Sequence, residues 1–216
     1  NDLAQSGFRV TIVGPRAPTT ANEKERATYR LPNILLGVAA LLLAVSMFLP
    51  YWEMSLKAPQ YPAGLSIQAH VNRLTGDVSE IDGLNHYIGM RPLSEAAQLE
   101  RAVGIFAVAA LALLVLAAVF VHSPWALLLA LPAVLWPFIF LGDMYYWMRL
   151  FGTTLDPTAP LSSSIKPFVP RILGSAMVGQ FETVASFQIG LWLAFLAVIL
   201  ILAGLFYQRR AYRPLS

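Results

Sequence analysis

The sequence predicts an all-α membrane protein with four transmembrane helices and two long outer-face loops, the first containing a small β-hairpin. Two observations lead to this class. Hydrophobic residues make up 57% of the 216-residue chain and charged residues 12%, whereas roughly a quarter of a typical soluble domain is charged. Four charge-free apolar stretches also reach the roughly 17–25 residues that a helix needs to cross the hydrocarbon core. They span about 31–49, 102–121, 124–141 and 187–207.

Positive charge sets the expected topology, because cytoplasmic segments carry an excess of Lys and Arg. The amino-terminal tail 1–30 contains five such residues and the carboxy-terminal tail 208–216 contains three. We therefore expect a multi-pass protein of the cytoplasmic membrane, with both tails in the cytoplasm and loops 50–101 and 142–182 outside. The net charge of +3 then reflects topology rather than nucleic-acid binding. Because a polar tail precedes the first span, we expect that span to remain as an anchor.

The first span and the loop after it carry local signals of their structure. Pro32 suits the first turn of a helix, where its missing N–H costs nothing, and Trp52 suits the outer membrane interface. Apolar and polar side chains alternate from residue 65 to residue 72, which indicates a strand. Gly76 then supplies a turn before a return strand, so we expect a hairpin in this loop.

The third span and the second outer loop are rich in proline and aromatic residues. Pro132 and Pro137 should kink the span. An aromatic cluster follows it and matches the outer membrane interface. Four prolines in loop 142–182 predict an extended course across the surface. The aromatic residues are Tyr145, Tyr146 and Trp147, and Asp143 lies beside them.

The spans hold almost no polar groups. Ser46 lies inside the first span, Gln188 lies at the outer end of the fourth, and the second and third contain no charged or amide residue. Because ion and proton pathways need such groups within the membrane, the sequence predicts no transport function. Small residues at helical spacing instead indicate close helix packing, within the bundle or against another subunit. They are Gly37, Ala40 and Ala44 in the first span and Gly190, Ala194 and Ala197 in the fourth.

The polar run EIDGLNHYIGM, residues 80–90, supports three interpretations. Asn85, His86 and Tyr87 are suited to fixing the loop to itself or to the second loop, as a structural and docking motif. His86 and Met90 are four residues apart, and with His70 they offer soft ligands for Cu(I). His86 or Asp143 could also bond a quinone carbonyl among aromatic residues.

The sequence contains no motif for cysteine-based metal or redox sites or for hydrolases. The chain has no cysteine, which excludes disulfides, thiolate zinc sites and the CxxCH haem attachment motif. It also has no nucleophile elbow and no HExxH motif. We therefore expect no enzymatic activity, no catalytic residues and no cofactor of its own.

Several motifs carry a family resemblance. FLPYWEMSLKAPQYPAGLSIQ, LTGDVSEIDGLNHYIGM, GDMYYWMRLFGTTLDPTAP and IKPFVPRILG, in this order, resemble a family of small four-span bacterial membrane proteins. That family is often encoded near nitrous oxide reductase, other copper enzymes and c-type cytochrome systems. The resemblance covers about residues 32–205 and leaves out the tail up to Arg30. It implies a role beside respiratory electron transfer and transfers no catalytic residue.

The composition is also similar to that of proteins from filamentous phototrophic bacteria. Their alternative complex III is a quinol-oxidising assembly of haem, iron–sulfur and membrane subunits that includes small accessory subunits. The resemblance implies a non-catalytic accessory subunit of a respiratory or photosynthetic electron-transfer complex, whose partner subunits carry haem, iron–sulfur clusters or quinone. A copper-handling or assembly factor for a periplasmic redox enzyme is the first alternative. A contributor to a quinone-binding site is the second.

Overall fold

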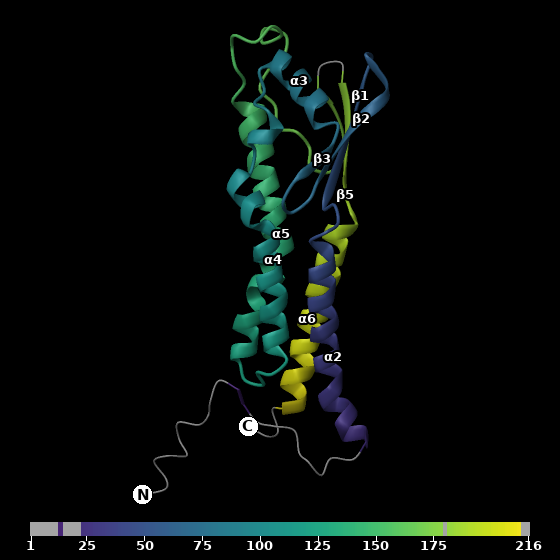
Figure 1. Ribbon diagram of the computed structural model, residues 1–216, viewed down its shortest axis with the longest axis vertical. Helices are drawn as coiled ribbons and strands as arrows, with labels where there is room; N and C mark the ends of the chain where they lie inside the picture. Colours follow the sequence, from purple (N-terminus) through teal and green to yellow (C-terminus); the bar gives the residue numbers. More distant parts are fainter. Residues whose placement is uncertain (1–12, 15–22, 179–180, 213–216) are drawn as a thin grey trace, which may run out of the picture. The chain divides into compact units, whose positions relative to one another are not determined.

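The computed structural model describes residues 13–14, 23–178 and 181–212 (Figure 1). Most of tail 1–30 and the last four residues of tail 208–216 therefore lie outside the described part of the chain. Within the described ranges, four helices are long and apolar enough to cross a membrane, so the chain is a multi-pass membrane protein. These helices are α2 (Glu23–Ser46), α4 (Gln98–Ala118), α5 (Trp125–Thr153) and α6 (Ile189–Tyr212).

The expected all-α class is wrong, because the segments between the spans form a five-stranded antiparallel sheet. The strand order is β3-β2-β1-β5-β4, so the two segments expected to be outer loops contribute to one sheet. The central strand β1 pairs with β2 on one side and with β5, more than a hundred residues later, on the other. The strands are β1 (Trp52–Ala58), β2 (Tyr61–Ala69), β3 (Leu74–Gly76), β4 (Gly174–Val178) and β5 (Phe181–Phe187).

Alternation of side chains explains why the central strands pair as they do. Trp52, Met54 and Leu56 point to one face of β1, and the polar or charged residues between them point to the other. The register places Met54 opposite Ile67 of β2 and opposite Ala185 of β5. This register collects the apolar side chains of three strands on one face, which we call the inner face of the sheet.

A helix replaces most of the expected return strand. The strand signal at residues 65–72 is realised within β2, but its partner β3 is only three residues long, and α3 (Val78–Ile88) follows. Ile81, Asn85 and Ile88 are buried on one side of α3, at the spacing that aligns residues on a helix face. Figure 1 shows α3 beside the sheet, and its buried residues join the core of the inner face.

Two span boundaries also differ from expectation. The first helix begins at Glu23, so Pro32 lies inside it rather than at its first turn. The third apolar helix, α5, continues well past residue 141 and ends at Thr153. Its last turns bring Met148 and Phe151 to the core of the sheet, because these residues lie on the side of the helix that the core covers. The segment expected to be a long second loop is therefore helix at its start and sheet at its end.

The described chain divides into two compact units. The helical unit comprises the described residues of 1–45, 107–136 and 193–216, and the sheet unit comprises those of 46–106 and 137–192. In the helical unit, Gln208 Nε2 donates a hydrogen bond to the carbonyl oxygen of Ala118 at 3.0 Å. Gly204 packs closely there, since a Cβ atom on it would lie 2.9 Å from Cγ of Leu36.

Candidate functional site

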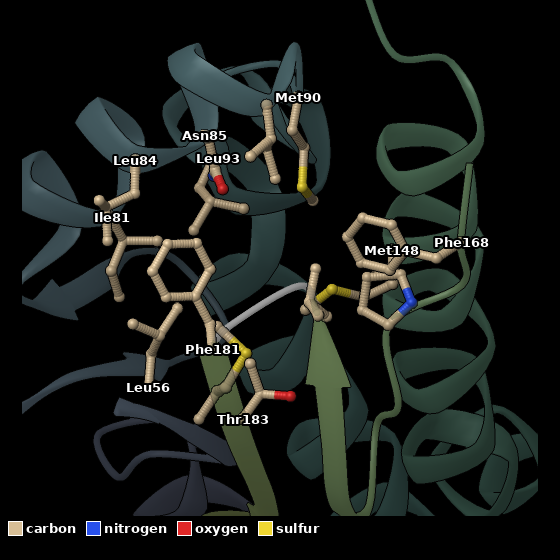
Figure 2. Close-up of a pocket in the computed structure, with 14 residues that line it drawn as sticks. Leu56, Ile81, Leu84, Asn85, Met90, Leu93, Met148, Phe168, Phe181 and Thr183 are labelled. Carbon is tan, nitrogen blue, oxygen red and sulfur yellow. The ribbon is translucent and has the colours of Figure 1, made fainter. Parts of the chain in front are cut away.

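A small cavity lies in the sheet unit, between the inner face of the sheet, α3 and α5 (Figure 2). Its volume is about 50 Å³, and most of the surrounding side chains are apolar. Met54 and Leu56 of β1 and Phe181 and Thr183 of β5 line it from the sheet. The buried face of α3 and Met148 of α5 line the other sides. The cavity is large enough for a few waters or one ion, since a single water needs only ~10–15 Å³.

The end of α3 turns Met90 into this cavity. Gly89 has a left-handed backbone with φ of 80°, which glycine adopts without a steric penalty. Its N–H donates to the carbonyl oxygen of His86, and the N–H of Met90 donates to the carbonyl oxygen of Asn85 at 2.9 Å. The chain therefore reverses direction at Gly89. As a result Met90 is buried and lines the cavity, while His86 is exposed.

Asn85 is a buried amide at the edge of the cavity. Its side chain is 8% exposed, and within the described residues its Nδ2 atom has no hydrogen-bond partner. The hydroxyl of Thr183, another polar group of the lining, donates to the carbonyl oxygen of Ala176 at 3.2 Å. A buried donor without a partner costs about 1–3 kcal/mol. Asn85 is therefore a lining residue whose amide donor is unsatisfied within the described residues.

The backbone of the NHYIG motif joins the first inter-helix segment to the second. The carbonyl oxygen of Gly89 accepts a hydrogen bond from the N–H of Asp156 at 2.7 Å, and that of Tyr87 accepts one from the N–H of Leu161 at 2.9 Å. Thr158 donates side-chain and backbone hydrogen bonds to Asp156, which lower the pKa of that carboxyl group. The motif thus fixes one segment to the other through main-chain hydrogen bonds, and the His86 side chain adds an electrostatic interaction with Asp156.

The three expected metal ligands lie in different surroundings. His70 follows β2, and its Nε2 atom is 3.3 Å from Oγ1 of Thr75. Burial lowers the pKa of His70, and the positive charge of Arg73 lowers it further. His86 is exposed against Tyr87, whereas Met90 is in the core. Within the described residues, no group of three His, Cys, Asp or Glu side chains could hold a metal ion.

The expected aromatic docking cluster divides between surface and interior. Tyr145 and Tyr146 are exposed on α5, as residues at a membrane interface would be. Trp147 is half-buried and packs edge-on against Phe151, with ring centroids 5.6 Å apart. Asp143 is also half-buried on the same helix. Only the two tyrosines therefore offer a free aromatic surface.

The expected small-residue stripes also differ from one another. Ala40, Ala194 and Ala197 are buried in the helical unit, but Gly37 has open space where a Cβ atom would be, and Ala44 is only half-buried. Gly190 belongs to the sheet unit, where a Cβ atom on it would lie 2.6 Å from the ring of Tyr51. Close packing is thus present at most of these positions, but not along the whole stripe in α2.

Sequence reasoning did not identify Met54 and Met148 as members of a site with Met90. Part of the signal was present, because Phe181, Ala185 and Phe187 lie at even spacing with Glu182 and Ser186 between them, and this partial alternation is a weak signal for a strand. The pairing of that strand with β1 could not be read from spacing along the chain. Comparison of the chain with protein-family models, with curated proteins and with solved structures finds no match.

Proposed function

We propose that the protein is a non-catalytic accessory subunit of a bacterial membrane electron-transfer complex. One observation carries the non-catalytic part of the proposal. In the described apolar helices, Asn33 and Trp147 each bury one polar atom without a partner, whereas the almost fully buried polar side chains are Ser46 and Gln208, and both have hydrogen-bond partners, the hydroxyl of Tyr51 and the carbonyl oxygen of Ala118. Neither is available for proton or ion transfer. The function then lies in binding to other molecules.

The electron-transfer part of the proposal is supported by the family resemblance. That resemblance implies a quinol-oxidising respiratory or photosynthetic assembly, in which partner subunits carry haem, iron–sulfur clusters or quinone. The helices expose many large apolar side chains, which suit lipid or the helices of a partner. The sheet unit adds a folded domain outside the spans, with a polar outer face that suits contact with water or with a polar partner surface.

The proposed location is the cytoplasmic membrane, with both tails in the cytoplasm and the sheet unit outside, because the tails carry the cations. The lack of native cysteine makes this topology testable by labelling single cysteines. Lys57→Cys on the outer face of the sheet should react with an impermeant maleimide in intact cells. Arg210→Cys, the matched control near the end of α6, should react only after the membrane is permeabilised. The opposite pattern would reverse the topology.

The accessory role itself is tested by isolating the protein from its own membranes in mild detergent. Mass spectrometry and metal analysis of the same native fraction should find haem and iron–sulfur subunits in fixed proportion to this chain. If the protein migrates alone on native gels across several mild detergents, it is not a subunit of such a complex.

The cavity size bears on the two alternatives. A cavity of ~150 Å³ accommodates a benzene ring, whereas the cavity here has about 50 Å³. A quinone ring does not fit this space, and the residues expected to bond a quinone, His86 and Asp143, do not line it. A single metal ion does, and the presence of methionines around it favours copper handling as the second candidate function.

A further inference from the structure

We propose that the cavity in the sheet unit binds a soft monovalent cation, Cu(I) or its analogue Ag(I), through the thioether sulfurs of Met54, Met90 and Met148. This site differs from the one expected from the sequence, because Met90 is retained while two methionines replace His70 and His86. The proposal also stands independently of the accessory role, since a cation site in the sheet unit does not require a partner complex.

The convergence of methionines is the first supporting observation. The chain contains six methionines, and three of them line this one small cavity. They come from β1, from the turn after α3 and from α5, which are far apart in the sequence. Figure 2 shows Met90 and Met148 reaching toward the same space from different sides. The fold therefore brings to one cavity three methionines that are far apart along the chain.

The chemistry of the lining selects the type of ion. Thioether sulfur is a soft ligand that favours Cu(I), whereas Ca²⁺ and Mg²⁺ require oxygen ligands and Zn²⁺ prefers thiolate or imidazole. The described lining contains no histidine, carboxylate or cysteine. Methionine is also flexible, so its sulfur can adjust to the geometry that an ion prefers. A neutral thioether loses no proton on binding, so the affinity should not change with pH as that of a histidine site would.

Asn85 is an independent sign that the cavity holds a polar species. Its amide is buried, its Nδ2 atom lacks a partner, and Figure 2 shows its side-chain oxygen turned toward the cavity. A water molecule alone would satisfy this amide. Water would not account for the three thioethers, because sulfur of this kind is only a weak hydrogen-bond acceptor. A cation accounts for both when it carries a water whose oxygen accepts a hydrogen bond from Nδ2 of Asn85.

The test is an anaerobic titration of the purified full-length protein with Cu(I) in competition with a chromophoric chelator, repeated with Ag(I). Since the chain has no cysteine, thiolates cannot contribute to the binding. We expect one equivalent to bind. Met54→Leu, Met90→Leu and Met148→Leu nearly conserve volume and should fold. Each should weaken binding at least about tenfold, because even loss of an outer-shell partner costs about 10–100-fold in metal affinity.

Matched controls separate the cavity from other sites. Met144→Leu, one turn before Met148 on α5, and Met177→Leu, on the exposed edge of β4, should leave the affinity unchanged. His86→Ala should also leave it unchanged. If His86→Ala abolishes binding and Met54→Leu does not, the ion binds at the surface and the cavity proposal is wrong.

A measurement on the unaltered protein covers the case in which a variant fails to fold. With methyl-labelled methionine, Ag(I) should shift the NMR signals of the three cavity methionines and leave that of Met177 in place. Absence of binding, or equal shifts at every methionine, would overturn the proposal. Neither result would affect the accessory role, which is judged by which subunits co-purify.

Discussion

The inner face of the sheet buries its large apolar side chains, whereas the long apolar helices expose many of their own. Trp52 and Ile67 are each 1% exposed in the sheet unit, but Phe120 is 71% and Leu113 is 66% exposed in the helical unit. Exposed apolar area costs about 25 cal/mol per Å² in water. The exposed apolar side chains of the helices are therefore stable only when lipid or another apolar surface covers them. The inner face of the sheet and the exposed faces of the apolar helices thus suit different solvents, water around the folded sheet and lipid around the helices.

The largest predicted effect compares one residue type in the two units. Phe151→Ala removes a fully buried ring from the core of the sheet unit and should destabilise it by about 3–5 kcal/mol. Phe120→Ala in the helical unit removes a ring that contacts solvent or lipid and should change stability little. Unfolding of both variants in the same detergent, followed by circular dichroism, measures the difference. Equal losses would mean that Phe120 is covered in the native protein.

The next effect concerns the junction between α3 and the second inter-helix segment. Gly89→Ala places a Cβ atom 2.6 Å from the carbonyl oxygen of Asp156 at a left-handed backbone position, and should destabilise the sheet unit by about 1–3 kcal/mol. Gly83→Ala on the same helix has open space around it and should be neutral or stabilising by about 0.5–1 kcal/mol. Limited proteolysis near residue 156 should therefore accelerate only in the first variant.

A smaller effect should appear in the helical unit. Gln208→Leu removes the hydrogen bond to the carbonyl oxygen of Ala118, and polar contacts between membrane helices contribute about 0.6 kcal/mol on average. Unfolding by a denaturing detergent should show a loss of this size. Gln208→Glu tests the same position with a charge. A loss of several kcal/mol for the leucine variant would show that this one amide contributes far more than ordinary membrane contacts.

The smallest predicted effect is a pH dependence confined to the sheet unit. The pKa of His70 is lowered from its ordinary value of 6.5, so the unfolded chain takes up the proton first as the pH falls. The contribution of neutral His70 is therefore complete above pH 6.5 and decreases as the pH falls from that value toward the folded-state pKa. Between about pH 7.5 and about pH 5.5, the wild type should lose more stability than His70→Gln. An identical loss in both would assign the pH dependence to another group.

The sequence predicted the apolar helices better than the sheet, for identifiable physical reasons. A charge-free run long enough to cross a membrane is a strong signal, and each of the four runs lies largely within a helix. The strand β5 has only a partial alternation from Phe181 to Phe187, broken at Thr183 and Val184, and it directly precedes an apolar helix, so the sequence alone does not predict a strand there. The charge-free run ends before Asp143 and so predicts an end near residue 141, whereas α5 continues through Met148 and Phe151 to Thr153.

The candidate site was only partly accessible from sequence. Met90 was identified because it lies near His86 in a polar run, and nearness along the chain suggested that the two act together. Gly89 separates them, since its left-handed backbone turns one side chain inward and leaves the other outside. Met54 and Met148 could be joined to Met90 only through strand register and helix packing, which depend on the whole sheet unit.

The pairing of β1 with β5 has a consequence for biogenesis. β1 and β5 are neighbours in the middle of the sheet, yet β5 is made only after α3, α4 and α5. During synthesis, one edge of β1 stays unpaired and its apolar face stays incomplete until α3, α4 and α5 have been made and β5 has reached the same side of the membrane. Such a delay exposes an edge strand to wrong partners. A chain truncated after α5 should therefore be a substrate for chaperones and proteases on that side of the membrane, even though three of its four apolar helices are intact.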